Sequence, residues 1–127
     1  MPVDQAVANW VRLAERDIGS ARYIVEHDPD NALFLCQQAI EKALKGIVQR
    51  NTDDVPPRTH HLLRLARLAG LADQLDPDQL ELLTVVGPYA TITRYPPDGQ
   101  APTVRADAAE IVERSEEAVR WLLARLK

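Results

Sequence analysis

The segment LFLCQQAIEKALKGIVQR, residues 33–50, constrains the fold more than any other part of the chain. When residues are placed at about 100° per position, the apolar side chains of this segment and its flank cover an arc of roughly 220°. A helix on the surface of a globular protein needs an apolar stripe only about 100° wide. We therefore expect a central helix over residues 31–50, packed by neighbours on more than one side.

The rest of the sequence divides into further helical blocks. Apolar residues recur at three- and four-residue steps over 4–26 and 104–126, while Thr59 and Asp76 are expected to open two shorter helices. Asp30 is the expected cap of the central helix. No segment of useful length has the two-residue period of a strand. The pattern predicts an all-α protein, an antiparallel up-and-down helical bundle of four long or medium helices plus a short fifth.

Length and charge narrow the class of protein. A chain of 127 residues fits one helical bundle domain over residues 1–127. The net charge of -4 gives no general attraction to phosphate backbones, so we expect no DNA binding, and RNA would need a local basic patch. The first residues lack the pattern of a signal peptide, and no uncharged apolar run is long enough to cross a membrane. The expected location is the cytoplasm, away from the membrane.

The central helix carries a narrow polar window. The remaining arc holds five polar residues and one aromatic residue: Gln38, Glu41, Lys42, Lys45, Gln49 and Phe34. Partners at i+4 are expected to be Gln37 with Glu41, Gln38 with Lys42, and Glu41 with Lys45. Such a window is commonly a solvated strip. An aromatic side chain on it indicates instead that another chain covers it, which makes Phe34 a candidate dimer-interface residue.

Common catalytic and metal-binding patterns are missing from the sequence. The single Cys36 lies among apolar residues and is expected to be a buried, inert thiol. His60 and His61 are adjacent and would point about 100° apart on a helix, so they cannot easily share one ion. No Gly-rich phosphate loop or Ser-His or Cys-His pairing is evident. We expect no metal and no cofactor.

Four blocks in order resemble the HEPN domain family. They are LAERDIGSA (13–21), with Asp17 at the family's acidic position, FLCQQAIEKALKGI (34–47), RTHHLLRLA (58–66) and YATITRYPPDG (89–99). The resemblance implies a bundle of four or five helices that is commonly a homodimer. It also implies a minimal nucleotidyltransferase as the partner protein, as in toxin–antitoxin-type pairs.

Some members of that family are metal-independent ribonucleases. Their signature is an Arg followed four to six residues later by a His, near the start of the last long helix. Here no His follows Arg94, and the one match, Arg22 to His27, lies at the end of the first helix. Whether the chain is an enzyme is therefore left open. An endoribonuclease would need another base, with His60 or His61 as the candidates.

The bundle and the resemblance together predict a basic cleft that binds nucleotide or RNA. Its candidate residues are Glu41, Lys42, Lys45, His60, Arg94 and Tyr95, because Arg grips phosphate and Tyr stacks on a base. An alternative reading makes Asp17, Lys42, Arg94 and Tyr95 a buried polar network that holds the Arg-Tyr-Pro loop, and His60 a helix-start residue bonded to the backbone. Three hypotheses follow: a nucleotide- or RNA-binding homodimer with a nucleotidyltransferase partner, a ribonuclease toxin, and a purely structural dimerisation module.

Overall fold

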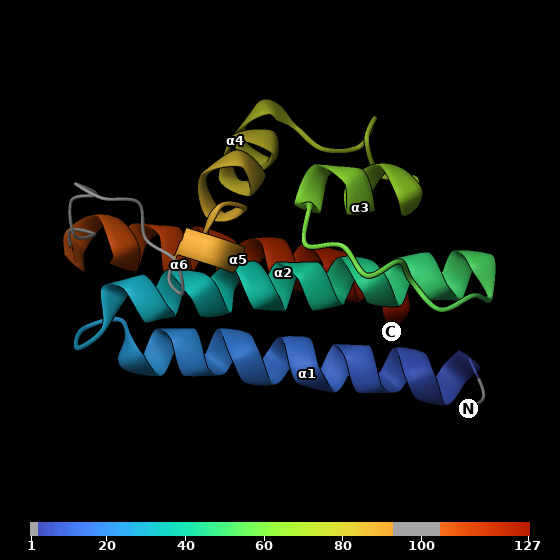
Figure 1. The fold of residues 1–127 in the computed structure, drawn as a ribbon, viewed down its shortest axis with the longest axis horizontal. Helices are drawn as coiled ribbons and strands as arrows, with labels where there is room; N and C mark the ends of the chain where they lie inside the picture. Colours follow the sequence, from blue (N-terminus) through green and yellow to red (C-terminus); the bar gives the residue numbers. More distant parts are fainter. Residues whose placement is uncertain (1–2, 93–104) are drawn as a thin grey trace.

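The computed structural model describes residues 3–92 and 105–127, and within these residues all regular structure is helical (Figure 1). The elements are α1 (Val3–Ile24), α2 (Pro29–Thr52), α3 (Leu62–Leu68), α4 (Pro77–Val86), α5 (Tyr89–Ile92), α6 (Arg105–Leu123) and the 3₁₀ turn η1 (Ala124–Leu126). The all-α bundle expected from the sequence is confirmed. The short turn α5 is not among the predicted helices.

Helix α2 lies at the centre of the molecule. Helix α1 packs along one side of it, α6 along another, and α3, α4 and α5 cover a third (Figure 1). Every residue of α2 from 32 to 49 is buried or half-buried. The expectation of a central helix, drawn from the wide apolar arc, is therefore confirmed.

The three long helices do not simply alternate in direction. Helices α1 and α2 form an antiparallel hairpin, and α6 runs in the same direction as α2 (Figure 1). The guanidinium of Arg50, near the end of α2, accordingly donates a hydrogen bond of 3.3 Å to the carbonyl of Leu126 at the end of the chain. Helix α3 lies over the second half of α2, and α5 lies over its first half (Figure 1).

Two helix starts differ from the sequence-based expectation. Asp28, not Asp30, caps α2, and its carboxylate accepts from the backbone N–H of Asn31. Pro29 explains the shift, because its fixed φ suits the first helical position. His61, not Thr59, caps α3, and its side chain accepts from the backbone N–H of Arg64. Asp76 caps α4 as expected, in a full capping box.

Gly46 sets how closely α2 meets its neighbours. A Cβ atom built there would lie 3.0 Å from Cδ1 of Leu126 and 3.1 Å from Cβ of Trp10. Only glycine leaves room for α1 and η1 to approach the same point of α2.

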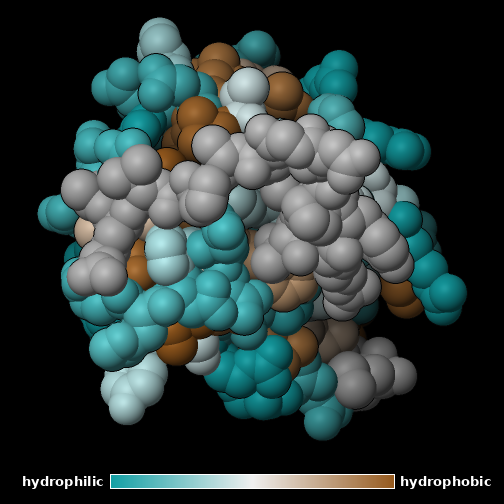
Figure 2. All heavy atoms as spheres, turned by 60° about the vertical axis from the view of Figure 1, so that its left-hand side comes forward, coloured by the Kyte–Doolittle hydropathy of each residue, from teal (hydrophilic) through white to brown (hydrophobic). Residues whose placement is uncertain are grey.

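The bundle keeps most apolar side chains inside. On the face shown in Figure 2, hydrophilic residues cover most of the described surface, and hydrophobic areas are smaller and lie between them. Among the described residues no helix is both long and apolar enough to cross a membrane.

Candidate functional site

At the centre of the polar window of α2 lies a buried carboxylate, that of Glu41. Glu41 is 4% exposed, and its Oε1 accepts from Nε2 of Gln37 at 3.0 Å, while its Oε2 accepts from Nζ of Lys45 at 3.0 Å. Oε1 also lies 2.7 Å from Nδ1 of His60. Three side chains therefore donate to one carboxylate, two from α2 itself and one from the segment before α3.

These contacts test the pairs expected along the helix. The i+4 pairs of Gln37 with Glu41 and of Glu41 with Lys45 are confirmed. The predicted pair of Gln38 with Lys42 is wrong, because Gln38 donates to Oε1 of Gln37 at 2.6 Å. Lys42 bonds instead to the carboxylate of Asp17 on α1. A charged carboxylate is a stronger hydrogen-bond acceptor for a lysine than the neutral amide of Gln38.

The environment of Glu41 keeps it ionised. Burial on its own raises the pKa of this carboxyl group, but the hydrogen bonds from Gln37, His60 and Lys45, together with the charge of Lys45, outweigh it. The pKa of Glu41 is therefore lowered from its ordinary value of 4.5. An ionised carboxylate can only accept hydrogen bonds.

That ionised carboxylate fixes the state of His60. Because Glu41 can only accept, we assign the proton at the 2.7 Å contact to Nδ1 of the imidazole. Nε2 is then the ring nitrogen that can bond to a ligand, and the side chain of His60 is 63% exposed. The contact with Glu41 uses Nδ1, and Nε2 takes no part in it. His60 is thus an exposed imidazole oriented by a buried base.

The same contact corrects the expectation that His60 bonds to the backbone at a helix start. Its ring bonds to the Glu41 side chain, and the helix cap is its neighbour His61. The carbonyl of His60 accepts from Nε2 of Gln37 at 3.3 Å. The side chain and the backbone carbonyl of His60 are therefore both hydrogen-bonded to α2.

Lys42 belongs to a second ion pair, on the α1 side of α2. Its Nζ bonds to Oδ2 of Asp17, which is 3% exposed, and Arg16 donates to Oδ1 of the same carboxylate at 3.1 Å. Asp17 and Lys42 are the described part of the buried polar network considered from the sequence. The charge of Lys42 is satisfied within the bundle.

The structure thus brings together some of the predicted site residues and separates others. Glu41, Lys45 and His60 form one network, and Lys42 lies in the other. Arg94 and Tyr95 lie outside the described residues. Phe34 is half-buried on α2.

Sequence reasoning placed Gln49 in the polar window but missed its contact with Trp10. Nε1 of Trp10 donates to Oε1 of Gln49 at 2.7 Å, and Nζ of Lys45 lies 6.0 Å from the centroid of the indole. Trp10 thereby covers the cationic end of the Glu41 network from α1. A Trp at the edge of an apolar stripe, opposite a polar window, is the signal that could have found it.

Sequence reasoning also missed a basic segment. Residues 58–64, RTHHLLR, carry four exposed side chains that hold or can take a positive charge: Arg58, His60, His61 and Arg64. The signal was visible in the sequence as two Arg and two His within seven residues. It is a local basic patch on a protein of net charge -4.

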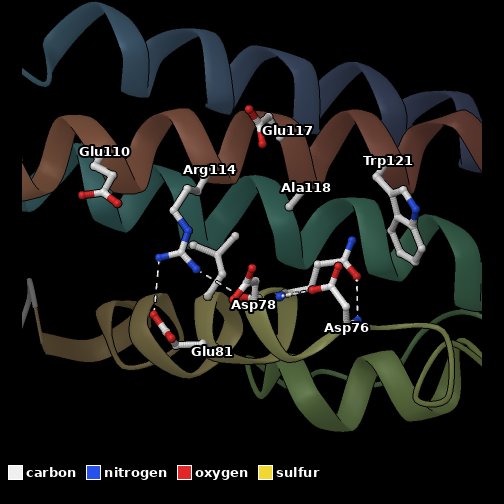
Figure 3. A pocket seen from close by; sticks show the side chains of 10 residues that line it. Asp76, Asp78, Glu81, Glu110, Arg114, Glu117, Ala118 and Trp121 are labelled. Atoms are coloured by element: carbon white, nitrogen blue, oxygen red, sulfur yellow. Dashed lines mark hydrogen bonds and ion pairs between the residues drawn. The ribbon is translucent and has the colours of Figure 1, made fainter.

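Two hollows of the surface are relevant to binding. One, of about 410 Å³, lies between the start of α3, the end of α4 and α5, and both His60 and His61 line it. The other, of about 650 Å³, lies between α4 and α6 (Figure 3). Carboxylates line the second hollow, and its Arg114 is engaged by Glu81 and the carbonyl of Asp78. Its charge disfavours an anionic ligand.

No group of three or more His, Cys, Asp or Glu side chains suited to a metal ion occurs in the described part of the chain. The Glu41 network offers one carboxylate that already accepts three hydrogen bonds.

Comparison with known proteins settles the family. The model of the HEPN domain matches residues 7–126. This chain belongs to the HEPN family. The crystal structure of ST0689, an archaeal HEPN homologue, is similar, with 29% identity and a TM-score of 0.71 over 95% of this chain and 98% of that one. The crystal structure of TT1696 from Thermus thermophilus is 27% identical, with a TM-score of 0.76 over 91% of this chain and 94% of that one. Among curated proteins, none matches this chain significantly.

Proposed function

We propose that this HEPN protein binds a nucleotide or RNA and acts as a homodimer beside a minimal nucleotidyltransferase, in a toxin–antitoxin-like pair. The observation that carries the proposal is the exposed imidazole of His60, held at Nδ1 by the buried Glu41 carboxylate at 2.7 Å. A side chain fixed in this way loses little conformational freedom on meeting a ligand. Its neighbours in the segment 58–64 supply positive charge for a phosphate.

The lysines of the polar window have a supporting role in this proposal. Lys42 is ion-paired with Asp17, and Lys45 is ion-paired with Glu41, with 17% and 11% of their side chains exposed. If either lysine moved away from its carboxylate to contact a ligand, that carboxylate would stay buried without a counter-charge, which is costly. We assign both lysines to holding the site and the segment 58–64 to contacting the ligand.

Calorimetric titration with ATP and with a short single-stranded RNA tests the binding. The wild-type protein is expected to bind at least one of them saturably, and His60→Ala is expected to weaken that binding roughly tenfold, the loss of about one charged hydrogen bond. His27→Ala is the matched control, since His27 is exposed in the turn after α1. Saturable binding that His60→Ala leaves unchanged would contradict the site. No binding at all would favour a purely structural dimerisation module.

Coexpression tests the partner. The chain should copurify with a nucleotidyltransferase encoded beside it, and the complex should keep a fixed stoichiometry in light scattering after size-exclusion chromatography. A nucleotidyltransferase neighbour that elutes separately at every concentration would defeat this part of the proposal, while leaving the binding site to its own test.

A second candidate function, a metal-independent ribonuclease, is favoured by the fixed tautomer of His60. With Nδ1 bonded to Glu41, Nε2 can take the proton of an RNA 2′-hydroxyl. The 2′-oxygen then bonds to phosphorus, the bond from phosphorus to the 5′-oxygen breaks, and the leaving oxygen takes a proton from water. This arrangement needs no His after Arg94.

Cleavage of a fluorogenic single-stranded RNA in the presence of EDTA tests the ribonuclease. Activity lost in His60→Ala and kept in His27→Ala would support it. The loss of a general base is expected to reduce the rate by about a hundredfold or more. A wild-type preparation without cleavage, or cleavage equal in both variants, would remove this candidate.

A further inference from the structure

The hollow beside His60 has walls of mixed character. It lies where the start of α3, the end of α4 and the turn α5 meet, and has a volume of about 410 Å³. The side chains that matter most for its chemistry are His60, His61, Leu63, Leu83, Thr84 and Ala90. Hydrocarbon forms much of the wall, and polar groups lie among it.

The two imidazoles offer opposite hydrogen-bonding groups. Nδ1 of His60 donates to Glu41, so its Nε2 accepts in the neutral ring. Nδ1 of His61 accepts from the backbone N–H of Arg64 at 3.3 Å, so its neutral ring carries the proton on Nε2 and can donate. One acceptor and one donor therefore stand side by side in the chain.

The hydroxyl groups of the hollow add acceptors. Oγ1 of Thr84 donates to the carbonyl of Leu80 at 3.0 Å, and Oγ1 of Thr91 donates to the carbonyl of Pro88 at 3.4 Å. Each hydroxyl already donates its only proton in a hydrogen bond, and its oxygen can still accept one. A saturated hydrocarbon would leave these groups without partners, whereas a ring with N–H and C=O edges can satisfy them.

Size and charge select among such rings. Ligand pockets commonly measure roughly 300–1000 Å³, and a hollow of about 410 Å³ is near the small end of that range. The segment that supplies both imidazoles also carries the exposed Arg58 and Arg64. The surroundings therefore favour a small flat ring joined to an anion.

We propose that this hollow receives the base of a mononucleotide, with its phosphate on the basic segment 58–64. The proposal rests on the nucleotide-binding function proposed above and names where the base lies. The larger hollow between α4 and α6 is unsuitable, because Asp76, Asp78 and Glu117 among its lining residues would repel the phosphate (Figure 3).

Calorimetric titration with two probes, AMP and ribose 5-phosphate, separates the base from the phosphate. The wild-type protein is expected to bind AMP at least about tenfold more tightly than ribose 5-phosphate, because only AMP carries a base that can be buried in the hollow. Equal affinities for the two probes would overturn the proposal.

Variants that fill the hollow give the second arm. Ala90→Trp places a large side chain on its α5 wall, and Thr84→Trp does so from α4. Both are expected to weaken AMP at least about tenfold and to leave ribose 5-phosphate unchanged. Val85→Trp is the matched control, since Val85 is exposed on the same helix as Thr84 and does not line the hollow. Circular dichroism checks that each variant is folded. If only one of the two filling variants folds, that variant alone is enough for the test.

The outcomes separate this proposal from the function on which it rests. AMP binding that is lost in His60→Ala and kept in both filling variants would overturn the base site and leave nucleotide binding intact. A wild-type protein that binds neither AMP nor any other nucleotide or RNA would remove both.

Discussion

At the scale of single residues, the buried carboxylate of Glu41 links the stability of the fold to pH. Its folded pKa is lowered from 4.5, so the folded state gives up this proton more readily than the unfolded chain does. Its contribution to stability is therefore present above about pH 4.5 and is lost as the pH falls through the lower folded pKa.

Replacing Glu41 by Gln tests this linkage. At pH 7 the free energy of unfolding should fall by roughly 3 kcal/mol, because Lys45 is left buried without its counter-charge. The difference from wild type should narrow as the pH falls below 4.5 and passes through the lowered pKa, because Glu41 then becomes protonated in the wild type too. Urea unfolding across this pH range measures it. Glu113→Gln, at an exposed position of α6, is the control. A gap that stays constant with pH would contradict the lowered pKa.

Cys36 shows the opposite effect of burial at the same scale. The residue is fully buried, and burial raises the pKa of its thiol to about 12. At pH 8 only about one thiol in ten thousand is then ionised, and the thiolate is the reactive form. Iodoacetamide should therefore leave the folded protein unmodified for hours by mass spectrometry, and should modify it within minutes in guanidinium chloride. Rapid modification of the folded protein would show that Cys36 is accessible.

At the scale of elements, two glycines in helices test how tightly α2 is packed. Gly46→Ala would bring a Cβ to 3.1 Å from Cβ of Trp10, an atom that cannot move without moving α1. We expect this variant to lose roughly 1 kcal/mol, since overpacking outweighs the gain in helix propensity. Gly19→Ala is the matched variant, with nothing within 4 Å of the new Cβ. It should gain roughly 0.5–1 kcal/mol. Urea unfolding of both measures the contrast, and stabilisation by Gly46→Ala would mean that α1 and α2 pack less closely.

How far the sequence could predict these elements depends on the range of the interactions involved. The central position of α2 and the bonds from Gln37 and Lys45 to Glu41 follow from helical periodicity, a local property. The bond from His60 to Glu41 joins residues 19 apart in the chain. No periodicity within one helix predicts such a contact. The caps at Asp28 and His61 were missed because several residues near each helix start are able to cap it.

At the scale of the whole molecule, α2 is a central helix with two charged anchors. Asp17 and Lys42 join it to α1, while Glu41 joins it to the segment before α3 through His60. The buried carboxylates of Asp17 and Glu41 are ion-paired with Lys42 and Lys45, so the polar window is part of the bundle. The group that lies outward of the window is the imidazole of His60, which comes from the segment before α3 and has 63% of its side chain exposed. A sequence pattern shows that a window exists, and only the fold shows which of its members face solvent.

The oligomeric state is the prediction that belongs to this largest scale. Phe34 is half-buried on α2, and we expect Phe34→Glu to weaken self-association of the proposed homodimer by roughly tenfold or more, since an interface core tolerates an unpaired charge poorly. Light scattering over a dilution series measures the mass, and far-UV circular dichroism should show unchanged helicity. Tyr23→Glu is the control, because Tyr23 is an aromatic residue that is 85% exposed on α1. A mass that is the same for wild type and Phe34→Glu at every dilution would defeat this interface. Equal weakening by Tyr23→Glu would attribute the effect to charge alone, and selective weakening by Phe34→Glu would place the second subunit against α2.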